Sequence, residues 1–495
     1  MRTNVKTLTK RFMSETNAAD LFRPPVNRAM RTLDRDAFRK TFPISAAVVK
    51  QNKDISSLRQ ALNQSNDALN IPRLSLLQTA PNMPHNKCML LRPDIKHDYP
   101  ATWSPTLTEI VNQARVDVVP YDLVLDYDYW SYDQIMSAIV PEENQEVYFP
   151  KRFTEVGHVL ISLQSVVVHL NLRQEHEPYK KVISEVLIDK SNRNIKTVIN
   201  KLDNVGDENA YRTFKYEVLA GPDDLMVEHH EDGCLFRFNF AKVYWNSRLQ
   251  EEHRRLVEKF QPGQAVCDVM AGVGPFVIPA AKKRVFVLGN DLNPDSYFYM
   301  RENIKVNKVD KFAQPYNEDG NAFIRNSAAY LLQKPVQAGY HDTAPKQKGP
   351  KTTEKRKGSP KPKEFIIMDR PQVFSHYVMN LPASAIDFLP SFIGLYTRSP
   401  VKEALNGADP RTLFAPHTNN KLPMIHVHCF CPKFPTTEES ETEILGRISE
   451  KLDFKIDRSM MKELDGEIYD VRDIAPGKEM FCVSFRLPAE VAFRE

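Results

Sequence analysis

The residues best suited to chemistry surround a glycine-rich turn in the second half of the chain. Asp268-Val-Met-Ala-Gly272-Val-Gly274 follows a short apolar run, and Asp291 ends the next one. The two glycines let the backbone approach a ligand closely, and a helix that begins there favours an anion at its N-terminus. A carboxylate at the end of the second strand, such as Asp291, is placed to accept hydrogen bonds from both hydroxyls of a ribose. From this spacing alone, a purely structural turn remains open.

Neighbouring residues favour S-adenosylmethionine over a dinucleotide as the ligand of this turn. The third glycine of the dinucleotide pattern is missing, because Val277 occupies its position. The carboxylate of Asp268 would repel a pyrophosphate, whereas it suits the amino group of a methionine moiety. After the third strand, Asp319-Gly320 supplies another acid and a tight turn, which fits contacts with an adenine. The pattern therefore predicts a methyl donor.

A second candidate motif, Asn380-Leu-Pro382, follows the fourth apolar run. At the carboxyl end of a sheet strand, an Asn followed by a Pro places a side-chain amide and a fixed carbonyl beside the cofactor. Amino-methyltransferases hold a planar nitrogenous base by its edge with this arrangement. The alternative is a helix N-cap followed by proline.

A third candidate is the pair Arg248 and Glu252, which lie four residues apart in a helical pattern before the glycine-rich turn. At this spacing the two side chains share one helix face, so they can converge on one ligand. The alternative is a surface salt bridge of little energetic value.

The elements that must position these residues follow an α/β rhythm over residues 246–495. The pattern predicts strands at Ala265–Val269, Val285–Asp291, Ala313–Asp319, His376–Asn380 and Met424–Phe430, with helices between them. This alternation predicts an α/β fold, a mostly parallel sheet with helices on both faces.

The first half of the chain is organised differently. Residues 1–20 form a basic tail similar to a mitochondrial presequence, with a disordered tail as the alternative. Residues 21–140 mix helical patterns and short apolar runs, which indicates a small α+β domain. Residues 141–245 form a strand-rich middle domain, with apolar stretches at Val182–Ile188, Thr213–Leu219 and Cys234–Phe240 separated by turn residues.

Composition bounds the function less than the motifs do. The chain has 495 residues, 42% of them hydrophobic and 26% charged, which excludes a collagen, a coiled coil and a wholly disordered chain. The formal charge of +4 is uneven, because Pro345–Lys363 holds eight basic residues and one acid. We expect this insertion (345–363) to be disordered, and it is either an electrostatic grip on RNA, a nuclear-targeting tract or a passive linker.

Membrane and metal functions find little support. The most apolar window, Val156–Leu172, is interrupted by polar residues, so we expect no membrane span. The six cysteines are scattered, which suits a reducing compartment and gives no zinc spacing. We therefore predict no metal.

Several ordered motifs together resemble the eukaryotic and archaeal tRNA (guanine-37-N1)-methyltransferase family. The resemblance is strong over residues 145–490 and looser over 20–140. It is carried by Val243-Tyr-Trp-Asn-Ser-Arg-Leu-Gln-Glu-Glu-His253, Asp268-Val-Met-Ala-Gly-Val-Gly-Pro-Phe276, Tyr377-Val-Met-Asn-Leu-Pro382, His169-Leu-Asn-Leu-Arg173, Arg212-Thr-Phe-Lys-Tyr-Glu-Val-Leu-Ala-Gly221 and Val471-Arg-Asp-Ile-Ala-Pro-Gly-Lys-Glu-Met480.

This resemblance implies a class I Rossmann-like methyltransferase domain with a seven-stranded sheet, preceded by α+β RNA-binding domains. Glu252 would be the general base for the guanine N1 proton, and Arg212 would stabilise the charge that develops on O6. Asn380 and Pro382 would hold the guanine edge, with Tyr244 and Arg248 placing the flipped base and the tRNA. The residues implied to line S-adenosylmethionine are His253, Asp291, Leu292, Asp319, Gly320 and Asn380.

The substrate implied is a tRNA with guanosine at position 37, without DNA or membrane partners, and the protein is expected to be a monomer. We expect it in the cytoplasm, nucleus and mitochondrial matrix. The alternatives are the paralogous aminocarboxypropyl transferase of wybutosine synthesis, a tRNA-binding protein without catalysis and a nicotinamide oxidoreductase. One departure from the family is the segment Val159–Val168, about eight residues longer than expected. It is either a longer hairpin or an unremoved intron.

Overall fold

A computed structural model describes residues 22–141, 154–156, 166–170, 174–191, 195–202, 211, 213–333, 335–341, 365–414 and 421–495. The chain divides into two compact units. The first comprises Met1–Phe153, Leu170–Asn200 and Val218–Pro222, and the second comprises Thr154–His169, Lys201–Glu217 and Asp223–Glu495. Because these bounds interleave, the domain borders at residues 141 and 246 stay a prediction. The tail 1–20 and the insertion 345–363 lie outside the described residues.

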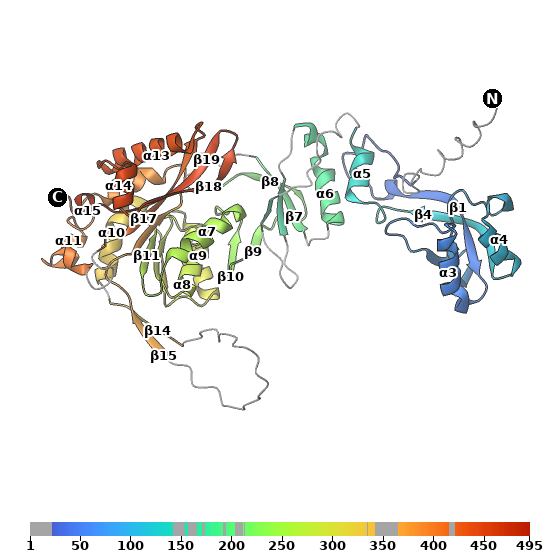
Figure 1. Cartoon of the computed structure of the whole chain (residues 1–495), viewed down its shortest axis with the longest axis horizontal. Coiled ribbons are helices and arrows are strands. Elements are labelled where there is room, and N and C mark those ends of the chain that lie inside the picture. Colours follow the sequence, from blue (N-terminus) through green and yellow to red (C-terminus); the bar gives the residue numbers. More distant parts are fainter. Residues whose placement is uncertain are drawn as a thin grey trace, which may run out of the picture. The chain divides into compact units, whose positions relative to one another are not determined.

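An antiparallel sheet of order β2-β3-β1-β4 organises the first unit (Figure 1). Its strands are β1 (Lys40–Val49), β2 (Leu77–Ala80), β3 (Met83–Leu90) and β4 (Val116–Leu125), with helices α3 (Ile55–Gln64), α4 (Pro105–Asn112) and α5 (Tyr132–Ile139). The core of this unit holds Trp130, whose fully buried indole N–H donates to the carbonyl of Phe38 at 2.8 Å. The unit thus has the α+β character expected for residues 21–140.

The strand predicted at Val182–Ile188 is wrong, because these residues belong to helix α6 (Lys180–Lys190). Val182, Ile183, Val186 and Leu187 are buried. Positions i, i+1, i+4 and i+5 lie on one face of a helix, so the apolar run has helical and not alternating periodicity. The other two stretches contain strands, β8 (Tyr216–Ala220) and β10 (Cys234–Asn239).

Further strands of this region are β5 (Thr154–Val156), β6 (Val166–Leu170), β7 (Ile195–Lys201) and β9 (Met226–Glu231). β5 and β6 pair antiparallel, with Val156 opposite Val167. The segment Val159–Val168 therefore ends inside a strand, while residues 159–165 lie outside the described part of the chain. β9 and β10 form a hairpin whose turn residues Asp232 and Gly233 both have positive φ.

Seven strands form the sheet of the second unit, in the order β13-β12-β11-β16-β17-β19-β18. The strands are β11 (Ala265–Asp268), β12 (Phe286–Asn290), β13 (Ala313–Tyr316), β16 (His376–Met379), β17 (Met424–Pro432), β18 (Glu467–Ala475) and β19 (Lys478–Arg486). Only β19 runs antiparallel to its neighbours β17 and β18. The predicted mostly parallel seven-stranded sheet of a class I methyltransferase fold is confirmed.

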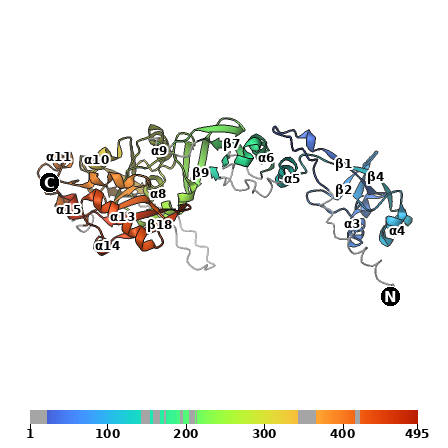
Figure 2. The same ribbon diagram turned by 90° about the horizontal axis from the view of Figure 1, so that it is seen from above.

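Helices cover both faces of this sheet. They are α7 (Gln250–Lys259), α8 (Val277–Lys282), α9 (Pro294–Val306), α10 (Gly320–Gln333), α11 (Val401–Leu405), α13 (Thr437–Leu452), α14 (Arg458–Glu463) and α15 (Ala489–Ala492). Figure 1 shows α7, α8 and α9 on one side and α13 with α14 on the other, and α13 and α14 also lie side by side in Figure 2. The central strands β11, β12, β16, β17 and β19 are mostly buried, whereas the edge strand β18 is largely exposed.

Two strands stand apart from the seven. β14 (Gln337–His341) and β15 (Phe365–Asp369) pair as an antiparallel ribbon that extends away from the sheet (Figure 1). Phe365 and Ile367 are exposed on it. In the described part of the chain, no helix has the length and apolarity that a membrane crossing needs.

Candidate active site

A cavity opens at the carboxyl ends of β11, β12 and β16, where the two halves of the sheet meet. β11 lies between β12 and β16, and the connections on its two sides leave in opposite directions, which creates a crevice above the strand ends. Its lining residues are Tyr211, Tyr244, Trp245, Asn246, Leu249, His253, Val269, Met270, Ala271, Gly272, Val273, Pro275, Phe276, Asn290, Asp291, Leu292, Ser296, Asp319, Gly320, Asn380, Leu381 and Phe388. Eight residues of the predicted site therefore come together here: Tyr244, His253, Gly272, Asp291, Leu292, Asp319, Gly320 and Asn380.

The glycine-rich turn forms one wall of the cavity. Gly272 and Gly274 have φ of +55° and +99°, backbone angles that side chains with a Cβ rarely adopt. The amide of Gly272 donates to Oδ2 of Asp291 at 2.8 Å, which fixes that carboxylate beside the turn. Gly274 lies behind the lining, where its amide donates to the carbonyl of Ala271. The backbone conformation of the turn is thus fixed by these hydrogen bonds.

The two acids after β12 and β13 are held by backbone amides. Oδ1 of Asp291 accepts from the amide of Asn293 at 2.9 Å, and Asp319 caps α10 by accepting from Asn321 and Ala322. Burial raises the pKa of Asp291. A Cβ on Gly320 would lie 2.8 Å from the ring of Phe388, so only glycine fits this close approach. Both acids therefore present fixed carboxylates to the cavity.

Asp268 is a buried carboxylate behind this cavity. Neither of its oxygens accepts a well-formed hydrogen bond from the described residues, although the backbone amide of Met270 lies close enough to favour the ionised form. Burial, with the nearby charge of Asp291, raises its pKa well above the usual range. Burial of an ionised carboxylate costs free energy unless a nearby positive charge compensates it. The position of Asp268 beneath the glycine-rich turn therefore fits a cationic part of a ligand.

The Asn380 segment enters the cavity from β16. Its amide Oδ1 is buried and accepts no hydrogen bond from the described residues, so this acceptor is available to a ligand. Pro382 is buried outside the lining, and its carbonyl accepts from the amide of Phe430 at 2.9 Å. β17 therefore fixes the backbone from which Asn380 projects.

Two arginines without an acidic partner in the described residues, Arg248 and Arg472, lie near the cavity. Arg248 is exposed and outside the lining, and Arg472 interacts electrostatically both with Arg248 and with Tyr244, which lines the cavity. Burial lowers the pKa of Arg472 on β18, and the positive charge of Arg248 lowers it further. The sequence prediction included Arg248 but missed Arg472, because nothing in the spacing of the two places β18 near this cavity. Two cations in this position suit a phosphate.

A second pair that the sequence prediction missed orients His253. Nδ1 of His253 lies 2.7 Å from Oε1 of Glu231 on β9, and both side chains are buried. Burial alone would raise the pKa of Glu231, but hydrogen bonds from His229 and His253 outweigh it and lower the pKa to about 2. The ionised carboxylate fixes the imidazole ring at the edge of the cavity. No signal in the sequence joins these residues, because their helix and hairpin are separate motifs.

Glu252 does not line the cavity. Its carboxylate is buried beneath it, accepts two hydrogen bonds from Arg255 at 2.6 and 2.8 Å, and lies 2.7 Å from Nε2 of His428. Burial alone would raise the pKa of Glu252, but these two partners lower it to about 2. The carboxylate is therefore ionised at neutral pH, as a base must be, but its ion pairs also weaken its affinity for a proton.

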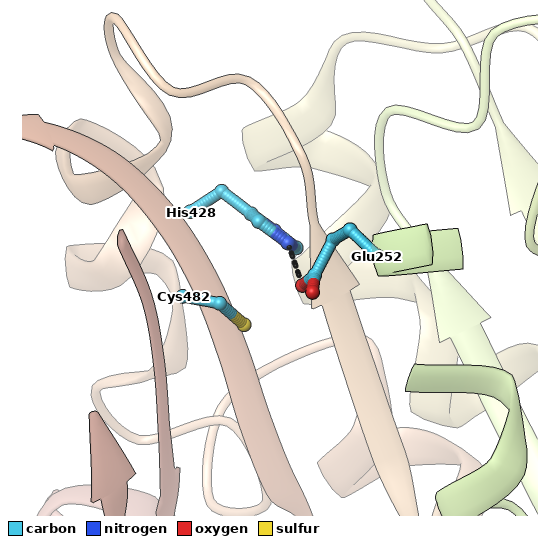
Figure 3. A group of neighbouring side chains, drawn as sticks. All are labelled: Glu252, His428 and Cys482. Atoms are coloured by element: carbon cyan, nitrogen blue, oxygen red, sulfur yellow. Dashed lines mark hydrogen bonds and ion pairs between the residues drawn. The ribbon is translucent and has the colours of Figure 1, made fainter. Parts of the chain in front are cut away.

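Glu252, His428 and Cys482 bring three potential ligand atoms within 4.8 Å of one another. Figure 3 shows that the three side chains point toward each other from α7, β17 and β19. The carboxylate already has the guanidinium of Arg255 and the imidazole as partners, so an additional cation would meet repulsion. The absence of a metal stays a prediction, and the role of Arg212 falls outside the described residues.

Comparisons with known proteins agree on one group of enzymes. Residues 227–338 match the TRM5/TYW2 methyltransferase domain, and residues 132–224 match the TYW2 N-terminal domain. The chain is 48% identical over 493 residues to the tRNA (guanine(37)-N(1))-methyltransferase of Aspergillus fumigatus, covering 98% of each chain. It is 48% identical to the protein of the same name from Emericella nidulans, over 96% of each chain.

Among solved structures, the fold is similar to that described as the complex structure of aTrm5 and tRNALeu. The sequence identity is 19% and the TM-score 0.49, over 90% of this chain and 100% of the other.

Proposed function

The chain belongs to the tRNA (guanine(37)-N1)-methyltransferase family, and from this we propose that it transfers a methyl group to N1 of guanosine 37 in tRNA. The observation that carries this proposal is the 48% identity to a relative of that name over 98% of both chains. Loss of catalysis would be expected to leave the cavity without its polar groups, but Asp291, Asp319 and Asn380 all line it.

We propose S-adenosylmethionine as the methyl donor. The glycine-rich turn and the fixed carboxylate of Asp291 suit the ribose, and the turn at Gly320 suits the adenine edge. The uncompensated carboxylate of Asp268 supports a cationic ligand, because a methionine ammonium would favour its ionised form. When bound, the sulfonium supplies the electrophilic methyl group.

The residues of this chain would then prepare the guanine. N1 carries a proton and its lone pair is delocalised, so removal of that proton is what makes it nucleophilic. The free acceptor of Asn380 suits an N–H on the guanine edge, and Arg248 with Arg472 suits the tRNA backbone. A base at position 37 must leave its stack to reach the cavity, which favours recognition as a flipped nucleotide.

Glu252 as the base and Arg212 as the group that stabilises O6 remain part of the proposal. The carboxylate of Glu252 is in the ionised state that proton abstraction needs. Because Arg255 and His428 hold it beneath the cavity, we propose that tRNA binding rearranges this helix before the proton is taken.

The experiment is methyl transfer from labelled S-adenosylmethionine to an unmodified tRNA transcript with guanosine at position 37, beside an adenosine-37 control. We expect N1-methylguanosine in the first transcript alone. Label in both transcripts, or in neither, would contradict the assignment.

The match of residues 132–224 to a TYW2 domain makes aminocarboxypropyl transfer the second candidate. The co-product separates the two reactions. Methyl transfer leaves S-adenosylhomocysteine, whereas transfer of the aminocarboxypropyl group leaves methylthioadenosine. We expect the former, and methylthioadenosine as the main product would favour the paralogous reaction.

A further inference from the structure

His428 joins two parts of the site that come from distant positions in the sequence. Its Nε2 lies 2.7 Å from Oε1 of Glu252 on α7, and its Nδ1 lies 3.4 Å from the carbonyl of Met379. Met379 ends β16 and directly precedes Asn380. We propose that His428 is a positioning residue for methyl transfer, which holds the Glu252 carboxylate and the Asn380 segment in one arrangement. This inference rests on the proposed function.

The two contacts define the charge of the ring. A carboxylate and a carbonyl are both acceptors, so each ring nitrogen must carry a hydrogen to bond them. The two bonds together therefore require the imidazolium form of the ring. Burial opposes this charge, but the sulfur of Cys482 and the carboxylate of Glu252 favour it and raise the pKa of His428 to about 10. The side chain is fully buried, so water does not replace either contact.

Charged groups surround this pair from every packed element. Arg255 on α7 binds the same carboxylate, and Glu467 of β18 lies 3.5 Å from the guanidinium of Arg255. Tyr469 of β18 lies under that guanidinium, 4.0 Å from ring centroid to Cζ. Among the described residues, Cys482 of β19, Asp268 of β11 and His426 of β17 also interact electrostatically with His428. Glu252 is therefore held between two cations, which fixes its direction.

The neighbouring histidine of β17 provides the structural comparison. His426 is equally buried, two residues earlier on the same face of the strand. Its nitrogens contact His376 at 3.0 Å and Ser484 at 2.7 Å, and neither of these residues lines the cavity. His426 thus serves the packing of the sheet, whereas His428 connects two elements of the site.

Two substitutions separate the two contacts of His428. Glutamine places an amide donor near Nε2 and retains the bond to Glu252, whereas asparagine places it near Nδ1 and retains the bond to Met379. The matched control is His426→Gln. Each variant is compared with the native chain by its rate of single-turnover methyl transfer to the guanosine-37 transcript between pH 5 and 8. Affinity for S-adenosylmethionine and thermal midpoint are measured in parallel.

We expect His428→Asn to lower the single-turnover rate about 10- to 100-fold, because small misplacements of reacting groups have effects of this size. The pH below which its rate declines should also be higher than for the native chain. The reason is that Glu252 then has only one of its two cations, which raises the pKa of its carboxylate. His428→Gln should recover much of the rate, because its amide still orients the carboxylate, but its pH profile should shift as that of His428→Asn does, because both variants lack the imidazolium charge. His426→Gln should change the thermal midpoint but not the pH profile.

Equal rates and pH profiles for His428→Asn and the native chain would overturn the inference while the proposed function stands. A native chain without transfer would instead remove the proposed function. If His428→Asn does not fold, ¹⁵N chemical shifts of the native His428 ring at pH 8 give the second test. Two protonated nitrogens support the bridge, and a neutral ring overturns it.

Discussion

At the scale of single residues, the carboxylates of the site differ in what surrounds them. Asp268 accepts no well-formed hydrogen bond in the described part of the chain, Asp291 accepts from two backbone amides, and Glu252 lies between two cations. Burial raises the pKa of Asp268 and of Asp291, whereas ion pairs lower that of Glu252 to about 2. A cationic ligand would therefore stabilise the carboxylate of Asp268 more than the other two. Glu252 has the lowest affinity for a proton of the three.

The first prediction concerns Glu252→Gln. The amide is nearly isosteric but cannot accept the N1 proton, so the single-turnover rate should fall about 10²- to 10⁴-fold. Affinity for S-adenosylmethionine should stay within about twofold, because Glu252 does not line the cavity. Glu251→Gln, on the exposed side of the same helix, is the control. A Glu252→Gln chain that methylates as fast as the native chain would remove Glu252 from the base role.

The second prediction concerns Glu231→Gln, which removes the charge that holds Nδ1 of His253. We expect affinity for S-adenosylmethionine, measured by calorimetry, to fall about 10-fold, the lower end of the effect of removing a partner that orients a binding residue. Asp291→Ala, which removes a carboxylate of the cavity itself, should weaken it at least as much. Glu228→Gln on the same strand, whose carboxylate pairs with Arg237, should leave it unchanged.

At the scale of elements, the ion pair between α7 and β17 makes stability depend on pH. The pKa of His428 is raised to about 10 in the folded chain. Its contribution is therefore complete below the unfolded pKa of about 6.5 and is lost as the pH rises from there toward 10. The pKa of Glu252 is lowered to about 2, so its contribution is complete above about 4.5 and is lost as the pH falls.

The third prediction follows from these two directions. The stability difference between the native chain and His428→Gln, measured by urea unfolding, should be constant from pH 5 to 6.5. It should then shrink steadily up to pH 8.5, because only the native chain contains the titrating ring. His426→Gln should show no such decline, since burial lowers the pKa of His426 and that ring is neutral over this range. A difference that does not change above pH 6.5 would show that His428 is neutral.

The same elements show what could be predicted from the sequence. The sequence predicts that the glycine-rich turn, Asp291, Gly320 and Asn380 lie together, and Gly272 of the turn and these three residues do line one cavity, because the ends of parallel strands meet at one edge of a sheet. Glu231 and His428 were not found, since their contacts join His253 across 22 residues and Glu252 across 176. The strand predicted within Lys180–Lys190 is wrong, because that prediction takes the apolar stretch as alternating although its residues repeat with helical periodicity.

At the scale of the whole molecule, charge is separated along the sequence. Pro345–Lys363 carries about +7, which leaves about −3 for the rest of the chain. The described strands on its two sides, β14 and β15, pair with each other, so the insertion begins and ends at one ribbon. A net charge of about −3 gives the rest of the chain no long-range electrostatic attraction to RNA. An electrostatic contribution to tRNA binding would therefore come mainly from this insertion.

The fourth prediction tests this contribution by replacing the eight basic residues of 345–363 with glutamine. KM for tRNA should rise several-fold at low salt, and log(kcat/KM) should fall less steeply with log salt, by about 0.7 for each phosphate that the variant no longer neutralises. Affinity for S-adenosylmethionine should not change. A variant with the same residues in shuffled order should retain the native slope, because counterion release depends on charge and not on sequence. If both variants keep the native KM and slope, the insertion is a linker, and the arginines near the cavity and the first half of the chain bind the tRNA.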